Sequence, residues 1–374
     1  MLHILTVIGA RPQIIKAAAI SRAIREKFAG KIRESLVHTG QHYDENMSQV
    51  FFDEMEIPSP DYNLAIGSGT HGKQTAEMIA RLEEVIQKEK PQAVLVYGDT
   101  NSTLAGAVAA SKMHVPLIHI EAGMRAHNKK MPEEVNRILC DHVSTLLFAP
   151  TKNAIYNLQR EGISKGAHPE KATIDAPAVY HCGDIMYDNS LHFARIAENK
   201  SEILKKTGVV AGKYFLATVH RDFNADDPER LRSILQGLKN IAAAFQFPVV
   251  FPVHPRTRQL LASVQIDPSL IKLIPPASFL EMTCLEKNAA LVLTDSGGVQ
   301  KEAFFFKRPC VILREETEWV ELVECGAAKL AGVDPHAIQV ATQTLLMDKI
   351  NYPEIFGDGK AANFICKEIL HHLG

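Results

Sequence analysis

The stretch LVLTDSGGVQKEAFFF, residues 291–306, decides the fold of this chain. It predicts a buried strand over residues 291–294, a polar turn over 295–298 and a helix that begins near Val299. A strand, a glycine turn and a helix in this order collect free backbone N–H groups at the positive end of the helix, which suits a phosphate. Glu302 lies one turn further on, where a carboxylate could accept hydrogen bonds from ribose hydroxyls. An ordinary βα turn, with glycines for backbone freedom, is the alternative interpretation.

The composition is that of a soluble globular protein. The chain has 374 residues, of which 46% are hydrophobic and 22% charged, and its formal net charge is −2. This length suits two domains, and the near-neutral charge argues against general nucleic-acid binding. Its six cysteines are scattered without a CxxC pair, which predicts reduced, packed thiols and a cytoplasmic protein. The apolar run at the N-terminus is too short for a signal peptide, and no apolar stretch is long enough to span a membrane.

The first strand is expected over residues 4–8, followed by the loop GARPQ and a helix over residues 13–28. This is how a doubly wound α/β domain begins. Arg11 and Lys16 come directly after the strand, at the sheet edge where such domains bind ligands. Two solvated basic residues on a surface loop are the alternative.

Carboxylates follow later strands of the first half. Asp99 stands after one strand, where it could be either a functional group or a helix N-cap. Glu121 ends the next strand, and because a buried carboxylate is costly without a partner, it is either paired or functional. Glu133 and Glu134 follow Pro132 at the start of a helix. Helix capping explains one of these two glutamates, but not obviously both.

The pattern of strand, turn and helix restarts after a charged segment, residues 198–206, which we expect to be a linker. The predicted fold class is therefore α/β, with two Rossmann-like domains facing across a cleft. We expect an N-terminal domain with the acids over residues 1–190 and a C-terminal, nucleotide-binding domain over 191–355. A last helix falls within residues 356–374.

The second half contributes a different set of polar residues to the expected cleft. His220, Arg221, His254 and Arg314 follow its strands, together with the turn at Ser296. Since the acids come largely from the first half, the second is expected to hold a nucleotide and present its attached group to them. The chain has no cysteine cluster at metal-ligand spacing. It also lacks the GxxxxGK[ST] loop of P-loop NTPases, and the opening loop GARPQ lacks the GxGxxG spacing of dinucleotide-binding domains.

Nine motifs occur in an order that resembles a known family: GARPQIIK, TGQHYDENM, VYGDTNSTLAG, HIEAGMR, MPEEVNR, LFAPT, TVHR, FPVHPRT and LTDSGGVQKEA. Together they are similar to the non-hydrolysing UDP-N-acetylglucosamine 2-epimerases over essentially the whole chain. The resemblance implies the two-domain fold of the glycosyltransferase-B type. In that fold the final helix, here expected over residues 360–371, crosses back onto the first domain.

The resemblance also implies a reaction on a UDP-sugar. The C2 proton is removed and UDP is expelled in an anti elimination, which gives a 2-acetamidoglucal, and UDP adds back after protonation of the other face. Cations and helix N-termini stabilise the charge on the leaving diphosphate, while carboxylates move the proton. No cofactor or metal is implied. The family suggests a cytoplasmic homodimer that serves polysaccharide or lipopolysaccharide O-antigen biosynthesis, with no nucleic-acid or membrane partner.

Carried over residue by residue, the resemblance implies a catalytic set and a binding set. The catalytic residues are expected to be Asp99, Glu121, Glu133 and His220, without an assignment of which acid acts on which face. The UDP-sugar is expected to be bound by Arg11, Lys16, Arg137, His220, Arg221, His254, Ala277, Met282, Ser296, Gly297, Gly298, Glu302 and Arg314.

The chain departs from the family pattern in places that concern specificity. Phe223 replaces an acidic residue in HRDFN, and Trp319 stands where a basic, nucleotide-contacting residue often sits. QHYDENMSQ and Asp222 differ from the residues that hold a second, activating UDP-N-acetylglucosamine in some bacterial members, so this regulation is not expected.

The stretches KEAFFF and TEWVELV resemble the branch that acts on UDP-2,3-diacetamido-2,3-dideoxy-glucuronate. We therefore expect this sugar as the substrate, converted to the manno form, with UDP-N-acetylglucosamine as the alternative. A hydrolysing epimerase, a glycosyltransferase and a non-catalytic UDP-sugar binding protein remain as other hypotheses.

Overall fold

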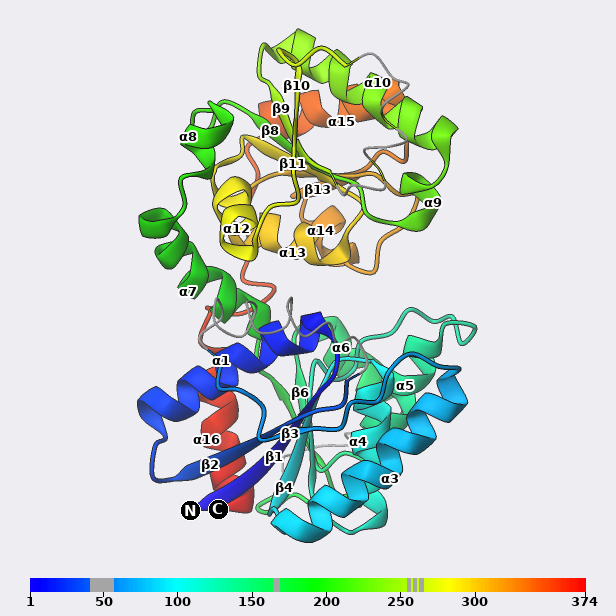
Figure 1. Ribbon diagram of the computed structural model, residues 1–374, viewed down its shortest axis with the longest axis vertical. Coiled ribbons are helices and arrows are strands. Elements are labelled where there is room, and N and C mark those ends of the chain that lie inside the picture. Colours follow the sequence, from blue (N-terminus) through cyan, green and yellow to red (C-terminus); the bar gives the residue numbers. More distant parts are fainter. Residues whose placement is uncertain (41–56, 164–168, 254–256, 258–260, 262–265) are drawn as a thin grey trace. The chain divides into compact units, whose positions relative to one another are not determined.

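The computed structural model describes residues 1–40, 57–163, 169–253, 257, 261 and 266–374. The chain divides into two compact units. The first comprises Met1–Asn189 and Ile355–Gly374, and the second comprises Ser190–Glu354. Each unit is built on a parallel sheet with helices on its faces (Figure 1). The predicted α/β class with two Rossmann-like units is confirmed.

The strands of the first unit are β1 (Leu2–Ile8), β2 (Ile32–His38), β3 (Tyr62–Asn63), β4 (Ala93–Tyr97), β5 (Leu117–Ile120), β6 (Leu146–Ala149) and β7 (Ala178–His181). Its helices are α1 (Arg11–Lys27), α3 (His71–Glu89), α4 (Asn101–Lys112), α5 (Pro132–His142), α6 (Lys152–Arg160), the start of α7 (Ile185–Lys200), and α16 (Ala361–Leu373).

Among the described residues, the strands of the first unit form a seven-stranded parallel sheet in the order β3-β2-β1-β4-β5-β6-β7. From β1, the next two strands in the sequence are added on one side. The strands from β4 onward are added on the other side. The topological switch point therefore lies between β1 and β4, which is where open α/β sheets bind ligands.

Helices cover both faces of this sheet, and its central strands β1, β4, β5 and β6 are accordingly buried along their whole length. Leu5 and Val7 of β1 belong to the same buried cluster as Met78 and Leu82 of α3 and several alanines of α4. On the other face, α1 and α16 pack against each other (Figure 1).

Helix α16 is fixed to the first unit at both of its ends. At its start, the Asp188 carboxylate accepts hydrogen bonds from the backbone N–H groups of Ala361 at 3.0 Å and Ala362 at 2.9 Å. These are two of the donors that a helix N-terminus leaves without an internal partner. At its end, the ring of His372 accepts from the backbone N–H of Ala172 at 3.2 Å and lies 2.7 Å from the Tyr180 hydroxyl.

The strands of the second unit are β8 (Phe215–Thr218), β9 (Val249–Pro252), β10 (Ile271–Ile274), β11 (Leu291–Thr294), β12 (Cys310–Ile312) and β13 (Ala328–Leu330). Its helices are α8 (Ile203–Thr207), α9 (Asp222–Ala225), α10 (Pro228–Phe245), α12 (Phe279–Asn288), α13 (Gly297–Phe305), α14 (Val320–Glu324) and α15 (Pro335–Met347).

In the described part of the second unit, these strands form a six-stranded parallel sheet in the order β10-β9-β8-β11-β12-β13. Helices α10 and α15 cover one face, and α12, α13 and α14 lie on the other (Figure 1). By the same rule as in the first unit, the switch point lies between β8 and β11. The stretch that begins the second half of this sheet, β11 with α13, is therefore placed where a ligand is expected.

The charged segment over residues 198–206 is largely helical, which differs from the linker that we expected. Helix α7 runs without interruption from Ile185 to Lys200, and α8 follows at Ile203–Thr207. Phe193 and Ala197 on α7 are buried, so packing of the apolar face extends the helix through residues whose charges favour solvent.

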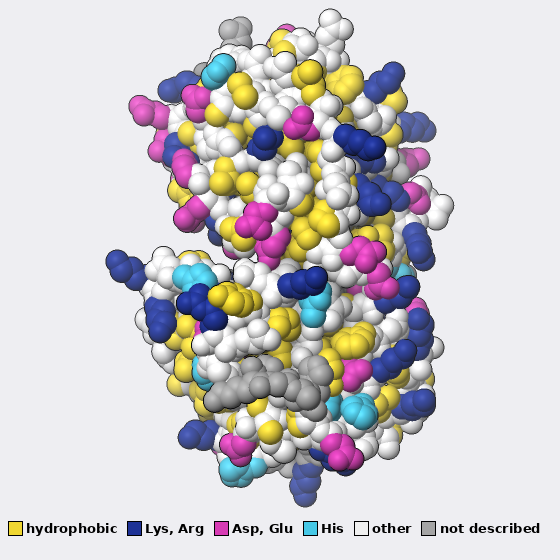
Figure 2. Space-filling model, turned by 180° about the vertical axis from the view of Figure 1, so that it is seen from behind, with side chains coloured by type: hydrophobic (Ala, Val, Ile, Leu, Met, Phe, Trp, Pro, Cys, Tyr) yellow, Lys and Arg dark blue, Asp and Glu magenta, His cyan; other side chains and the backbone are white. Residues whose placement is uncertain are grey.

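The surface carries mixed charges. On the face that Figure 2 shows, basic and acidic side chains are interspersed, in keeping with the formal net charge of −2. None of the helices in the described ranges combines the length and apolar character that a membrane crossing needs. All six cysteines are free, as expected.

Replacing Asp188 by Ala should lower the free energy of unfolding by about 1–2 kcal/mol, because two N–H groups of α16 lose their acceptor. Burial raises the pKa of Asp188 to about 6. Below that pH the folded state binds more protons than the unfolded state, so the stabilisation by Asp188 grows as pH falls. The difference in free energy of unfolding between the wild type and the variant should therefore be larger at pH 5 than at pH 7.5. Chemical denaturation measures this difference. The exposed Asp348→Ala is the control, and equal stability of the two variants would contradict the assignment.

Candidate functional site

Glu121 lies directly after β5 with a backbone φ of +75°, a left-handed conformation that is uncommon for residues other than glycine. Its carboxylate forms an ion pair with the Nζ of Lys16 on α1, and the two side chains are 15% and 12% exposed. The sequence left Glu121 as either paired or functional, and the structure shows that it is paired. A strained backbone that points a charged group off a strand end is typical of functional sites.

Gly98, in the turn after β4, makes room for this ion pair. Its φ is +62°, and a Cβ atom there would lie 3.1 Å from both the Glu121 Oε2 and the Lys16 Nζ. This position favours glycine for two reasons: its φ lies in the left-handed region, and a side chain would press against the ion pair. The turn after β4 thus supports the charged pair that joins α1 to β5.

Asp99 does not cap a helix. The N-cap of α4 is Thr100, whose hydroxyl accepts from the backbone N–H of Thr103, so the N-cap interpretation of Asp99 is wrong. The Asp99 carboxylate instead forms an ion pair with Arg137 of α5. Burial alone would lower the pKa of Arg137, but Asp99 and nearby glutamates raise it above the ordinary arginine value.

The two glutamates at the start of α5 have different surroundings. Glu134 is buried and accepts hydrogen bonds from the backbone N–H groups of Ala126 at 2.9 Å and His127 at 2.8 Å. It also pairs with Arg137 at 2.9 Å. Burial alone would raise the pKa of Glu134, but these contacts lower it. Glu134 is therefore the structural member of the pair, whereas Glu133 is exposed on the first turn of the helix.

A buried glutamine that the sequence did not single out joins the two central turns of the first unit. The Oε1 of Gln13 accepts from the backbone N–H groups of Gly9 at 2.9 Å and Ala10 at 3.1 Å. Its Nε2 donates to the carbonyl of Tyr97 at 2.9 Å, at the end of β4. The Gln13 side chain thus connects the loop after β1 to the end of β4, across the switch point. Arg11 stands at the end of this loop, and the Arg11 side chain is exposed. The motif GARPQ contains Gln13, but Tyr97, which accepts its hydrogen bond, is distant in the sequence. The motif therefore did not indicate this contact.

In the second unit, a buried aspartate joins the two turns at the switch point. The carboxylate of Asp295 accepts from the backbone N–H groups of His220 at 2.9 Å and Arg221 at 3.2 Å, and from the side-chain amide of Asn224 at 3.1 Å. The turn after β8 is thereby held beside the turn after β11. The side chains of His220 and Arg221 are exposed above these contacts. Asn224 is buried within the short helix α9.

Helix α13 begins at Gly297, two residues earlier than predicted, and Ser296 occupies its N-cap position. The Ser296 side chain makes no capping hydrogen bond, so the N–H groups of the first turn remain for an anion. A Cβ on Gly297 would lie 2.1 Å from the Oε1 of Glu318, so a larger residue there would displace the Glu318 side chain. On Gly298 the nearest atom would be the Ser296 hydroxyl at 3.8 Å, which leaves that side of the turn open.

The loop over residues 314–319 packs onto α13. Arg314 donates to Glu318 at 2.9 Å. Trp319 is buried, and the Nζ of Lys301 lies 4.3 Å from the centroid of its ring. The tryptophan that departs from the family pattern therefore packs inside the second unit, against a buried lysine of α13.

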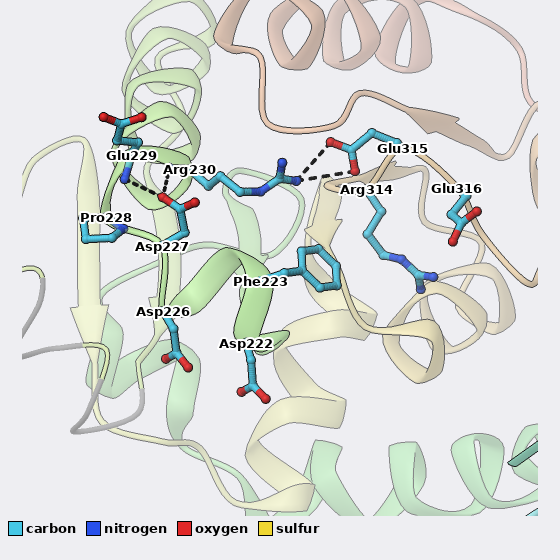
Figure 3. Close-up of a pocket in the computed structure, with 10 residues that line it drawn as sticks. All are labelled: Asp222, Phe223, Asp226, Asp227, Pro228, Glu229, Arg230, Arg314, Glu315 and Glu316. Atoms are coloured by element: carbon cyan, nitrogen blue, oxygen red, sulfur yellow. Dashed lines mark hydrogen bonds and ion pairs between the residues drawn. The ribbon is translucent and has the colours of Figure 1, made fainter. Parts of the chain in front are cut away.

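A pocket of about 1030 Å³ lies within the second unit, beside Arg314 (Figure 3). Arg230 crosses it to pair with Glu315 at 3.0 Å and lies 5.6 Å from the ring of Phe223. Six of its ten lining residues are acidic: Asp222, Asp226, Asp227, Glu229, Glu315 and Glu316. Such a lining disfavours a diphosphate, so the start of α13 is the better anion site in this unit.

The remaining predicted binding residues lie around the same sheet edge or outside the described residues. Ala277 and Met282 are half-buried, in the loop after β10 and on α12. Glu302 is half-buried on the second turn of α13. His254 and the stretch QHYDENMSQ lie outside the described residues. Among the residues that the structure describes, no group of three or more His, Cys, Asp or Glu side chains could hold a metal ion.

Comparison with known proteins identifies the relatives of this chain. A family model described as UDP-N-acetylglucosamine 2-epimerase matches residues 24–370. The UDP-2,3-diacetamido-2,3-dideoxy-D-glucuronate 2-epimerase of Pseudomonas aeruginosa is 48% identical over 367 residues, which cover 98% of this chain and 99% of that protein. The crystal structure of Methanocaldococcus jannaschii UDP-GlcNAc 2-epimerase in complex with UDP-GlcNAc and UDP is 42% identical, with a TM-score of 0.81 over 98% of this chain and 99% of that one.

A more distant structure supports the fold alone. Phytolacca americana UGT2, complexed with UDP-2fluoro-glucose and pterostilbene, is 11% identical and has a TM-score of 0.62. The match covers 99% of this chain and 94% of that one. The fold is therefore shared with glycosyltransferase-B proteins at a level where sequence similarity has been lost.

Replacing Asp295 by Ala should lower the free energy of unfolding by about 3 kcal/mol, because two backbone N–H groups and a buried side-chain amide lose a charged acceptor. The exposed Asp226→Ala is the matched control and should stay within about 0.5 kcal/mol of the wild type. Chemical denaturation followed by circular dichroism measures both. A wild-type transition for Asp295→Ala would show that the two turns are held together by other contacts.

Proposed function

We propose that this chain, which belongs to the UDP-N-acetylglucosamine 2-epimerase family and is a UDP-sugar 2-epimerase, acts on UDP-2,3-diacetamido-2,3-dideoxy-D-glucuronate. Its reaction class is isomerisation. The observation that carries the choice of sugar is the 48% identity, over 98% of the chain, to the Pseudomonas aeruginosa enzyme named for that substrate. UDP-N-acetylglucosamine is the alternative, because the 42% identical Methanocaldococcus jannaschii structure holds it.

The proposed reaction inverts C2 through an elimination. A carboxylate takes the C2 proton, the C–H electron pair forms a C1=C2 double bond, and the C1–O bond breaks with its electrons leaving on UDP. An acid then protonates C2 from the opposite face, and a UDP oxygen adds back to C1. Atoms and charge balance without an oxidant or reductant. Each step either transfers a proton or breaks or forms the bond between C1 and UDP.

The first unit is proposed to move the proton. Asp99 and Glu121 lie at the ends of neighbouring strands, and each is paired with a cation, Arg137 and Lys16 respectively. Cations held beside carboxylates can stabilise negative charge that develops on the substrate when the proton leaves. Glu133, exposed on the first turn of α5, is the third acid in this proposal. Arg11 is proposed to contact the substrate from the start of α1.

The second unit is proposed to hold UDP as a leaving group. The first-turn N–H groups of α13 and the open side of Gly298 suit the diphosphate, and Glu302 suits the ribose. The exposed side chains of His220 and Arg221 stand on the turn that Asp295 fixes beside this helix end. His254, Ala277, Met282 and Arg314 complete the proposed nucleotide contacts. A cytoplasmic homodimer serving polysaccharide or lipopolysaccharide O-antigen biosynthesis is part of the same proposal.

The substrate assignment predicts that UDP-2,3-diacetamido-2,3-dideoxy-D-glucuronate is converted with a higher kcat/KM than UDP-N-acetylglucosamine when both are assayed side by side. In deuterated water, the epimerised product should carry deuterium at C2, because the proton is lost to a carboxylate and returned by another group. Mass spectrometry and NMR of the products measure both results. A preference for UDP-N-acetylglucosamine would replace the proposed sugar, and product without C2 label would exclude the elimination.

Gly98→Ala should reduce kcat on the order of 10-fold, because its Cβ would displace the ion pair of Lys16 and Glu121 by a few tenths of an ångström. Gly30→Ala is the matched control, since Gly30 also has a positive φ, +79°, but nothing lies within 4 Å of its Cβ position. Both variants should lose about 1 kcal/mol of stability to backbone strain. Equal kcat in the two variants would show that the ion pair does not take part in turnover.

A further inference from the structure

His119 is a fully buried histidine in the centre of β5, and both of its ring nitrogens contact hydrogen-bond acceptors. Its Nδ1 lies 2.7 Å from the Oδ1 of Asp141, and its Nε2 lies 2.9 Å from the carbonyl oxygen of Gly98. A carbonyl has no hydrogen to donate, so Nε2 must carry a proton. The Asp141 carboxylate is paired with Arg125 and is therefore ionised, so it is likewise an acceptor and Nδ1 must carry a proton as well.

The ring of His119 is therefore an imidazolium. Burial alone would lower the pKa of His119, but Cys140 and Asp141 raise it well above the ordinary histidine value. Burial alone would raise the pKa of Asp141, but His119 and Arg125 lower it. The direction of both shifts agrees with the hydrogen-bond geometry, which requires a charged pair.

Asp141 extends the same contacts to a second turn. Its Oδ2 accepts from the backbone N–H of Gly123 at 3.1 Å and pairs with the buried guanidinium of Arg125 at 2.7 Å. Arg125 in turn donates to both carboxylate oxygens of Glu161, at 2.7 and 2.6 Å. Every charge in this buried cluster thus has an opposite partner, which a charge removed from water requires.

The cluster ends on the two turns that carry the acids of the first unit. Gly98 precedes Asp99, and Glu121 stands between His119 and Gly123. Three residues of these turns have left-handed backbones: Gly98 at +62°, Glu121 at +75° and Gly123 at +79°. Glycine adopts a positive φ at no steric cost, whereas Glu121 in this region is strained and persists only where the surrounding contacts over-determine it.

We propose that His119 and Asp141 are positioning residues of the epimerase: as an imidazolium–carboxylate pair they fix the turns of Asp99 and Glu121 and hold Glu121 in its strained conformation. They do not touch the substrate and act through the two acids. The inference rests on the proposed roles of Asp99 and Glu121, and it assigns a function to a buried charge that the reaction itself does not use.

Two substitutions separate the contacts of His119. In His119→Gln, the side-chain amide takes the place of Nε2 and can still donate to Gly98. In His119→Asn, it takes the place of Nδ1 and reaches only Asp141. We expect kcat to fall on the order of 10-fold in His119→Gln and 100-fold in His119→Asn, with KM changed less than about 3-fold, because small misplacements of reacting groups act on turnover. His114→Gln, at an exposed position on the turn before β5, should keep wild-type kcat.

Histidine side-chain ¹⁵N NMR of the wild-type protein tests the charge directly and needs no variant that might misfold. One histidine should keep an imidazolium signature at pH 9, and this signal should be absent from the folded His119 variant and lost or neutral in Asp141→Asn. A spectrum with only neutral rings at pH 9 would overturn the inference, as would wild-type kcat in either His119 variant. All rates are taken relative to wild type on whichever UDP-sugar it turns over with C2 exchange. Absence of exchange in the wild type would instead refute the proposed mechanism.

Discussion

A buried carboxylate that accepts backbone N–H groups from βα turns is the interaction on which both candidate half-sites depend. Asp295 does this in the second unit and Asp141 in the first. A carboxylate without access to water must find all its donors in the protein, and turns supply them at fixed positions. Each aspartate therefore fixes turns at the carboxyl edge of a sheet, and these turns carry exposed side chains.

The two half-sites use this support for different chemistry. In the first unit, Asp99 and Glu121 are each paired with a cation, which is the arrangement that the proposed proton transfer uses. In the second unit, the exposed groups are a helix N-terminus and two basic side chains, which suit an anion. A UDP-sugar carries both kinds of requirement in one molecule, since its sugar loses a proton while its diphosphate gains charge.

The sequence predicted the α/β class, the strand ends and the glycine turn before α13, because these follow from local periodicity and turn residues. It left Glu121 as either paired or functional and could not indicate the partner, because Lys16 lies 105 positions away. Asp295 was predicted only as part of a turn, and Gln13 and Asp141 were not predicted as site residues, because their roles come from contacts with residues that are distant in the sequence. In the charged segment over residues 198–206, burial of one helix face outweighed the local composition, so a helix formed where a linker was expected.

The central claim is that UDP leaves the sugar and returns to it in each turnover. A substrate with ¹⁸O in the bridge between C1 and the β-phosphate tests this directly. Free rotation of the β-phosphate while UDP is detached would move the label into non-bridging positions. We expect this scrambling, followed by ³¹P NMR, to accompany epimerisation in recovered substrate and product. Epimerisation with the label fully retained in the bridge would contradict it, because the C1–O bond would then never have broken.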